Sequence, residues 1–219
     1  KAKKIVEILN KYEESHKTIV YLTELGFNMK DALNIYNTYK QDTIRKVEHN
    51  LYELIDEVDE ITFPKIDPIS IKLDIQPNDE RRVKACILYV MNDLCFQNGD
   101  TYLSKEEIYY KTNTYLKFEL EEDSYAGYLQ ELEEDSKIVI EENRYYLMNF
   151  YEAECNIAAK IHKLSMMEPI SYKKLAYRLE EMERASGITY NEKQKEAITK
   201  ALEQNVLIIT GGPGTGKTT

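Results

Sequence analysis

The sequence lacks the signals of several large protein classes. Its three cysteines (Cys86, Cys95 and Cys155) have no CxxC spacing, and its three histidines lie far from them and from one another. A zinc site and a disulfide framework are therefore not expected. The apolar runs are all short, and the amino terminus has no charged-then-apolar signal pattern. We therefore expect no membrane contact and a cytoplasmic location.

Positive charge is in short supply as well. The 219 residues carry 39 acidic and 29 basic side chains, a formal net charge of −10. This balance opposes general attraction to nucleic acid, so any DNA contact must be local. With 42% hydrophobic residues, the chain is long enough for two small domains. It has no initiator methionine and stops one residue after Thr218, so we expect it to be a part of a longer protein.

Residues 1–75 have the apolar spacing of helices and predict two helical hairpins in tandem. The first hairpin is divided at Gly26 and Phe27, and the second at residues 59–62. We interpret the two hairpins as an internal pseudo-repeat. Pro77 and Asn78 interrupt the periodicity, which predicts a domain boundary there.

Residues 76–150 predict a second module of helices and strands. A helix is expected over 81–96, then a short extended piece over 101–103, then a helix opened by a capping box of Ser104 and Glu107. A further helix over 124–134 precedes a hairpin formed by 137–141 and 144–148. This order is that of a winged-helix module, and an arbitrary small α+β fold is the alternative.

Residues 151–190 predict a helical connector, and residues 191–219 predict the start of a further domain. There, a helix beginning at Asn191 precedes residues 206–210, an apolar run without alternation that is typical of a strand buried on both faces of a parallel sheet. The predicted fold class is mainly α with a small β-hairpin (α+β). It combines tandem helix-hairpin-helix elements, a winged-helix-like module and the start of a P-loop RecA-like α/β domain.

One motif carries chemistry. Residues 211–218 read Gly-Gly-Pro-Gly-Thr-Gly-Lys-Thr and fit G-x-x-x-x-G-K-[ST], the phosphate loop of nucleotide-binding proteins. Glycines let the loop curl with positive φ, so that backbone NH groups face one phosphate. We expect Lys217, the catalytic candidate, to reach the β and γ phosphates, and Thr218 to bind Mg²⁺. The cofactors expected are ATP and Mg²⁺. The residues expected to bind the nucleotide are Gln194, Gly211, Gly212, Pro213, Gly214, Thr215, Gly216, Lys217, Thr218 and Thr219.

Gln194 lies 17 residues before Gly211, near the start of the preceding helix. Its amide offers a donor and an acceptor, which suits an adenine edge. Asn191 and Gln194 also have the spacing of a capping box. From spacing alone the two roles are equally supported, and one side chain is not expected to fill both at once.

The segment Asn-Glu-Lys-Gln-Lys-Glu-Ala-Ile at 191–198, followed by the apolar run and the phosphate loop, resembles the Q motif and motif I of superfamily 1 helicases, and of the RecD-like group in particular. Long-form RecD-like helicases carry helix-hairpin-helix elements ahead of the motor, and residues 16–75 look similar to them. The resemblance implies an ATP-dependent 5′ to 3′ DNA helicase, acting on single-stranded or duplex DNA in repair or recombination, and favours adenine for Gln194. It also implies that these residues alone are inactive, because the acidic residue of the Mg²⁺ site, the arginine finger and the second RecA-like domain are missing.

A helix-hairpin-helix contacts DNA through a Gly-hydrophobic-Gly turn that brings backbone NH groups to a phosphate. In the first hairpin, residues 24–26 keep only Gly26, with Lys30 nearby. In the second, residues 60–62 keep no glycine, and the carboxylate of Glu60 would repel a phosphate. We predict at most a weak DNA contact at Gly26 and Lys30, and a structural role for the second hairpin.

Residues 119–135 hold eight acidic side chains and no Lys or Arg. Because this segment includes the helix that would enter the major groove, we expect it to face the motor or a protein partner instead of DNA. Two rival functions stay open: another P-loop ATPase such as an AAA+ protein, and a non-catalytic interaction module. We expect the phosphate loop, so close to the end of the sequence, to be poorly ordered here and to bind ATP weakly or not at all.

Overall fold

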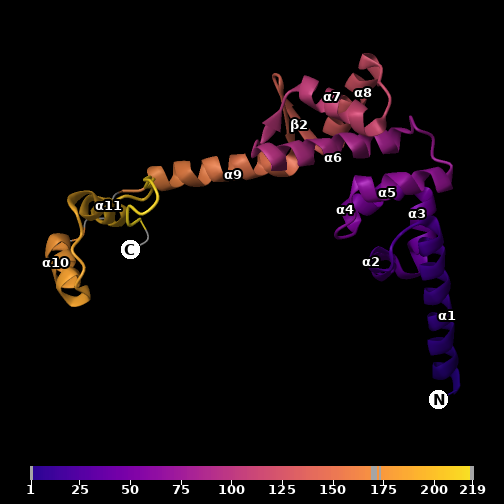
Figure 1. Ribbon diagram of the computed structural model, residues 1–219, viewed down its shortest axis with the longest axis horizontal. Helices are drawn as coiled ribbons and strands as arrows, with labels where there is room; N and C mark the ends of the chain where they lie inside the picture. Colours follow the sequence, from indigo (N-terminus) through magenta and orange to yellow (C-terminus); the bar gives the residue numbers. More distant parts are fainter. Residues whose placement is uncertain (1, 169–171, 173, 218–219) are drawn as a thin grey trace. The chain divides into compact units, whose positions relative to one another are not determined.

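The computed structural model describes residues 2–168, 172 and 174–217, with side chains from residue 13 onward. Its described residues form two compact units, within 1–151 and 152–219. Unit 1 contains two neighbouring parts, a set of short helices and a module built on a small sheet. The mainly helical fold with a small antiparallel sheet confirms the predicted fold class (Figure 1).

The first part of unit 1 is the predicted pair of helical hairpins. Its helices are α1 (Ala2–Leu25), α2 (Met29–Tyr39), α3 (Thr43–His49), α4 (Leu54–Glu57) and α5 (Phe63–Ser70), with single 3₁₀ turns η1 (Lys40–Asp42), η2 (Leu51–Glu53) and η3 (Ile71–Leu73). Asn28 begins α2, because its side-chain oxygen accepts the Asp31 backbone NH. Helix α3 was not among the helices expected from the sequence.

The turns of the two hairpins have the same build. Gly26 (φ 117°) and Glu60 (φ 65°) take the positive-φ position, Phe27 and Ile61 follow with buried side chains, and an extended residue then begins the next helix. The matching triplets are therefore 26–28 and 60–62. The sequence-based alignment, which compared 24–26 with 60–62, was out of register by two residues, because only the backbone angles identify the turn position.

The second part of unit 1 is built on α6 (Glu80–Asn98). It continues through β1 (Tyr102–Leu103), α7 (Lys105–Leu116), α8 (Glu122–Glu134), β2 (Ile138–Glu141) and β3 (Arg144–Leu147). The strands form an antiparallel sheet in the order β1-β3-β2. The hairpin and the capping box that begins α7 are confirmed. The sequence did not predict that the short extended piece would pair with β3 to make a third strand.

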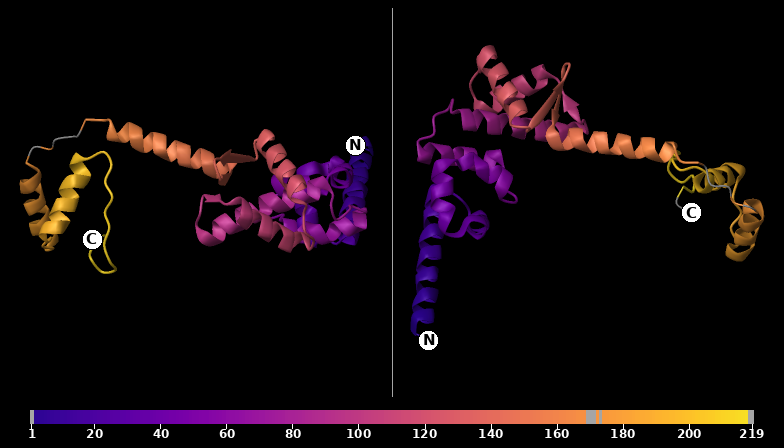
Figure 2. Two further views of the ribbon diagram at one scale, coloured as in Figure 1. Left: turned by 90° about the horizontal axis from the view of Figure 1, so that it is seen from above. Right: turned by 180° about the vertical axis from the view of Figure 1, so that it is seen from behind.

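Helix α6 lies between the helical hairpins and the sheet module in both views that show it lengthwise (Figures 1 and 2). Its fully buried side chains, among them Val83, Cys86 and Ile87, belong to one hydrophobic core that also takes in both hairpins and the sheet. Arg82, at the start of α6, holds Asp67 of α5 by two hydrogen bonds of 2.7 and 2.8 Å. The predicted boundary near residue 76 therefore lies inside a single packed unit.

Unit 2 holds most of α9 (Met148–Ser165), together with α10 (Leu175–Ser186) and α11 (Glu192–Glu203). Within its described residues only Leu179 is buried. The predicted strand over 206–210 is absent from the structure, and Ile208 is 83% exposed. A strand forms by pairing its backbone with a neighbour, and no described residue pairs with this segment. The apolar composition of residues 206–210 predicted a strand, but a strand also needs a neighbouring strand, and none of the described residues provides one.

Candidate functional site

The predicted phosphate loop follows α11 and residues 204–210, which form neither helix nor strand. Gly214 and Gly216 have φ values of 74° and 73°, in the left-handed region that glycine adopts at little cost. A Cβ added at Gly211 would lie 2.9 Å from Oγ1 of Thr215, so a side chain at residue 211 would require the Thr215 side chain to move. Positive φ at Gly214 and Gly216 is what the curled loop of the motif requires, and the residue types present fit a phosphate group. Thr218 and Thr219 lie outside the described residues.

Lys217 is bound by its own loop in this structure. Its Nζ donates to the carbonyl oxygens of Gly211 and Gly212, at 2.6 and 2.7 Å. Oγ1 of Thr215 also donates to the Gly212 oxygen, at 2.9 Å. The ammonium thus occupies the centre of the loop, and these carbonyl oxygens compete with phosphate oxygens for it. Residues 211–217 thus take a curled conformation closed by this lysine.

Gln194 has the capping role in this structure. Its Oε1 accepts the backbone NH of Asn191 at 2.9 Å, and the Asn191 side chain accepts the NH of Gln194 at 3.0 Å. Its Nε2 points to the Thr215 carbonyl oxygen, at 3.5 Å. One amide therefore begins α11 and reaches the phosphate loop at the same time. The geometry brings Gln194 and Thr215 together, as the predicted site requires, although the amide faces protein atoms.

The predicted DNA residues lie at the turn of the first hairpin. The Gly26 NH donates within the chain, to the carbonyls of Leu22 and Thr23 at 3.2 and 3.1 Å. Lys30 forms an ion pair with Glu60 from the second hairpin. Their hydrogen bond raises the pKa of Lys30 and lowers the pKa of Glu60. The groups that would meet a phosphate are thus already engaged by protein atoms.

Two further lysines near these turns were not singled out from the sequence. Lys65 Nζ donates to the Glu60 carbonyl oxygen at 2.7 Å and pairs with Asp31 at 3.3 Å. Lys72 Nζ donates to the Glu24 carbonyl oxygen at 2.7 Å and lies 3.9 Å from the position of a Cβ on Gly26. Both lysines follow the second predicted turn, at residues 60–62, and this position in the sequence could have identified them. Each lysine is held by an internal acceptor.

Some acidic side chains of residues 119–135 form contacts within the fold. Glu131 pairs with Lys84 of α6 at 2.5 Å, and Glu133 Oε1 accepts the Ile140 NH of β2 at 3.1 Å. Residues 51–150 contain 23 acidic and 10 basic side chains, a net charge of −13, which exceeds the −10 of the whole chain. The negative charge of the protein is therefore concentrated in the second hairpin and the sheet module.

The described part of the chain has neither a helix that could span a membrane nor a cluster of metal-ligating side chains. None of its helices is both long and apolar enough to cross a membrane. It contains no group of three or more His, Cys, Asp or Glu side chains placed to hold a metal ion. Cys86 is fully buried, and burial raises the pKa of its thiol to about 12, which suits a core residue and not a nucleophile.

Comparison with known proteins finds similarity to two family models and to a curated relative. Residues 4–102 match the family model of the ATP-dependent RecD2 DNA helicase HHH domain, and residues 194–219 match that of an AAA domain. A segment of 82 residues is 32% identical to the RecBCD enzyme subunit RecD of Buchnera aphidicola subsp. Acyrthosiphon pisum (strain APS). That segment covers 37% of this chain and 13% of the relative. The first match begins with the helical hairpins and extends through α6 to the start of β1, and the second begins at Gln194 and includes the phosphate loop.

Proposed function

We propose that this chain is the amino-terminal region of a RecD-like, ATP-dependent DNA helicase that moves 5′ to 3′ and acts in DNA repair or recombination. The observation that carries the proposal is the order of parts along one chain. RecD2-type hairpins come first, and a capped helix with Gln194 and a curled glycine loop with Lys217 follow. An AAA+ ATPase is the second candidate, since its phosphate loop can have the same sequence.

In this proposal the loop residues 211–217 hold the phosphates of ATP. Lys217 would release the carbonyl oxygens of Gly211 and Gly212 and bind the phosphates, and Gly214 and Gly216 would allow the loop to turn its NH groups inward. Thr218 supplies a hydroxyl for Mg²⁺. The bound nucleotide with its metal supplies the phosphoryl group whose hydrolysis drives movement. Without the motor residues that activate water, these 219 residues are expected not to hydrolyse ATP.

For Gln194 we propose adenine recognition by the amide that now caps α11. A two-point contact with adenine needs both Oε1 and Nε2, so the amide must release the Asn191 NH and the Thr215 carbonyl. Asn191 keeps its own half of the cap meanwhile, because its side chain accepts the backbone NH of residue 194. Nucleotide binding is thereby linked to the first turn of α11.

The nucleotide proposal is tested in the longer protein that includes the motor. Lys217→Ala removes the ammonium and is expected to abolish ATP hydrolysis and to weaken binding of a fluorescent ATP analogue at least tenfold. Lys200→Ala is the matched control, since Lys200 is half-exposed and pairs with Glu196 on the same helix. Unchanged hydrolysis in Lys217→Ala, or an equal loss in both variants, contradicts the proposal.

The DNA proposal places a weak phosphate contact at Gly26 and Lys30. Glu60→Gln releases Lys30 from its ion pair and removes one carboxylate, so DNA affinity should rise about two- to fivefold, the effect of one exposed ion pair. Glu13→Gln makes the same chemical change on the exposed surface of α1. Fluorescence anisotropy with labelled single-stranded and duplex DNA measures both variants. If the Glu60→Gln variant binds no better than the Glu13→Gln control, the first hairpin does not contact DNA.

The finer organisation is part of the same proposal. We propose helix-hairpin-helix elements over 1–75, a winged-helix-like module over 76–150, a connector over 151–190 and the start of the motor over 191–219. The helix-strand order and the β1-β3-β2 sheet support the winged-helix assignment. The acidic charge of 119–135 supports a protein partner for this module in place of DNA. The cytoplasm is the location expected from the sequence.

A further inference from the structure

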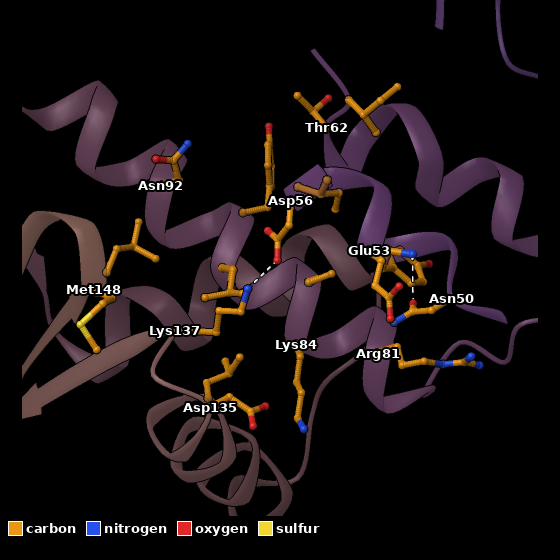
Figure 3. A pocket seen from close by; sticks show the side chains of 18 of the residues that line it. Asn50, Glu53, Asp56, Thr62, Arg81, Lys84, Asn92, Asp135, Lys137 and Met148 are labelled. Atoms are coloured by element: carbon orange, nitrogen blue, oxygen red, sulfur yellow. Dashed lines mark hydrogen bonds and ion pairs between the residues drawn. The ribbon is translucent and has the colours of Figure 1, made fainter. Parts of the chain in front are cut away.

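A groove runs along α6 between the second hairpin and the sheet module, and we name it the α6 groove. It encloses about 860 Å³, within the range of ligand-binding clefts. Its floor is one face of α6 that includes Arg81, Lys84, Leu88 and Asn92. One wall comes from residues 50–62 and the other from residues 132–149 (Figure 3). The floor from residue 81 to 92 is roughly 16 Å long at the helical rise per residue, so the groove suits an elongated occupant.

The α6 groove exposes apolar surface that the fold leaves half-covered. Ile55, Ala85, Leu88, Tyr89 and Met148 all line it, and each is only half-buried. They come from the wall of the second hairpin, from the floor and from the wall of the sheet module. An apolar strip flanked on both sides by charged groups is what an amphipathic peptide segment covers when it binds.

The charged groups around the α6 groove carry a net negative charge. The groove-lining charges and their direct ion-pair partners are six carboxylates (Glu53, Asp56, Asp79, Glu80, Glu131 and Asp135) and four cations (Lys46, Arg81, Lys84 and Lys137), a net charge of −2. Every one of these cations is paired, and Lys46 and Lys84 each serve two carboxylates. The surplus favours a positively charged occupant.

One ion pair joins the two walls. Lys137 Nζ, just before β2, lies 2.6 Å from Asp56 Oδ2 of α4, and the residues are 81 positions apart in sequence (Figure 3). Their side chains are 46% and 55% exposed. A pair this exposed is weak and opens readily. The Lys137 ammonium therefore occupies a position beside Asp56 that a cation of a bound segment could take instead.

We propose that the α6 groove binds a basic amphipathic segment of a protein partner. Its apolar side chains cover Leu88 and the neighbouring floor and wall residues, and one of its cations takes the place of Lys137 on Asp56. The alternative occupant is single-stranded nucleic acid, for which Tyr89 and the groove cations would be the contacts. The net charge of −13 over residues 51–150 favours the peptide. This inference does not depend on ATP binding or helicase activity.

The two occupants require opposite responses to the same two substitutions. Asp56→Asn removes the acceptor that a basic peptide needs and is expected to weaken its binding about two- to fivefold. Lys137→Gln removes the internal competitor and is expected to strengthen it by a similar factor. For a nucleic acid both signs reverse, because Lys137 then attracts phosphate and Asp56 repels it. Leu88→Ala should weaken only an occupant that covers the groove floor.

The experiment is fluorescence anisotropy with the 219-residue chain and three labelled probes. The probes are a helical peptide of about 14 residues, long enough for the groove floor, with leucines on one face and lysines on the other, the same peptide with glutamates for lysines, and oligo(dT). Asp42→Asn and Lys17→Gln are the matched controls, since both residues are exposed and outside the groove. Circular dichroism checks that each variant keeps its helical signal.

The proposal is supported if the lysine peptide binds, the glutamate peptide does not, and Asp56→Asn and Lys137→Gln act with the opposite signs given above while both controls bind as the parent chain does. It is overturned if the lysine peptide does not bind. Equal losses in Asp56→Asn and Asp42→Asn also overturn it, because they show attraction to overall charge alone. Binding of oligo(dT) that is weakened by Lys137→Gln assigns the groove to nucleic acid instead.

Discussion

The Arg82–Asp67 pair is expected to be a main electrostatic link between the second hairpin and α6. The guanidinium holds the carboxylate through Nε and Nη2, at 2.7 and 2.8 Å, and donates from Nη1 to the Pro77 carbonyl oxygen at 2.7 Å. Tyr52 donates its hydroxyl to the same carboxylate at 2.9 Å. The side chains of Arg82 and Asp67 are only 10% and 19% exposed, so solvent screens the pair weakly.

Removing one partner therefore leaves a charge in a poorly solvated place. Arg82→Met strands the Asp67 carboxylate and should lower the free energy of unfolding by about 3 kcal/mol. For a unit of 151 residues this corresponds to a fall in Tm of roughly 6–12 °C. Asp67→Asn strands the guanidinium and should cost about 2–3 kcal/mol, although its amide oxygen can still accept from Tyr52. The double variant leaves no buried charge and should lie within about 1 kcal/mol of the parent chain.

Urea unfolding followed by far-UV circular dichroism measures the four proteins of this cycle. Arg45→Met is the control, because Arg45 and its partner Asp42 have side chains 76% and 63% exposed and their pair should contribute under about 0.5 kcal/mol. The reasoning predicts that the two single losses do not add. If the double variant loses the sum of the single losses to within about 0.5 kcal/mol, the pair is not coupled and the structural argument fails.

Three further results are expected. Ellman's reagent should react with the exposed Cys155 thiol in the folded chain. Burial raises the pKa of the Cys86 thiol to about 12, so Cys86 should react only after denaturation. Rapid labelling of Cys86 would show that α6 opens. The hydrogen bond from its capping serine lowers the pKa of Glu107, so its contribution is complete above the ordinary pKa of 4.5 and is lost as pH falls through the lowered value. Melts from pH 7 to pH 3 should therefore show a lower Tm at pH 7 and a smaller acid loss for Glu107→Ala, and parallel curves would contradict this. Asn191→Ala should speed amide exchange in the first turn of α11 more than Gln194→Ala, since only the former removes the side-chain acceptor of a helical NH; equal rates would count against the cap.

Several features of this chain could be predicted from residues close together in sequence. Both capping boxes, at Ser104 and at Asn191, follow from a spacing of three residues, because the hydrogen bonds that they make lie within one helical turn. The hairpin of β2 and β3 likewise follows from two short β-rich segments and a two-residue connection. The positive φ values of Gly214 and Gly216 could be predicted too, because the backbone conformation of a glycine-rich turn depends on residues close in sequence.

Other features depended on segments that sequence spacing does not connect. The strand predicted over 206–210 failed because an apolar run defines a candidate strand, whereas a strand needs a paired neighbour. Lys30, at which a weak DNA contact is predicted, forms an ion pair with Glu60, which lies 30 positions away on the second hairpin. The sequence left Gln194 between capping and adenine recognition; the structure shows its amide capping α11, with Nε2 3.5 Å from the Thr215 carbonyl oxygen, 21 positions away.

The sequence by itself determined the helices with strong local signals, their caps, the β-hairpin and the glycine positions of the predicted phosphate loop. Only the tertiary structure decided which charges are free. Lys30, Arg82 and Lys137 look alike as basic residues in the sequence, yet each is held by a carboxylate that lies 15 to 81 positions away. Local hydrogen bonds are fixed by neighbours along the chain, whereas ion pairs and grooves depend on how separate elements pack. For that reason the sequence showed the nucleotide motif, and the α6 groove became visible only in the folded protein.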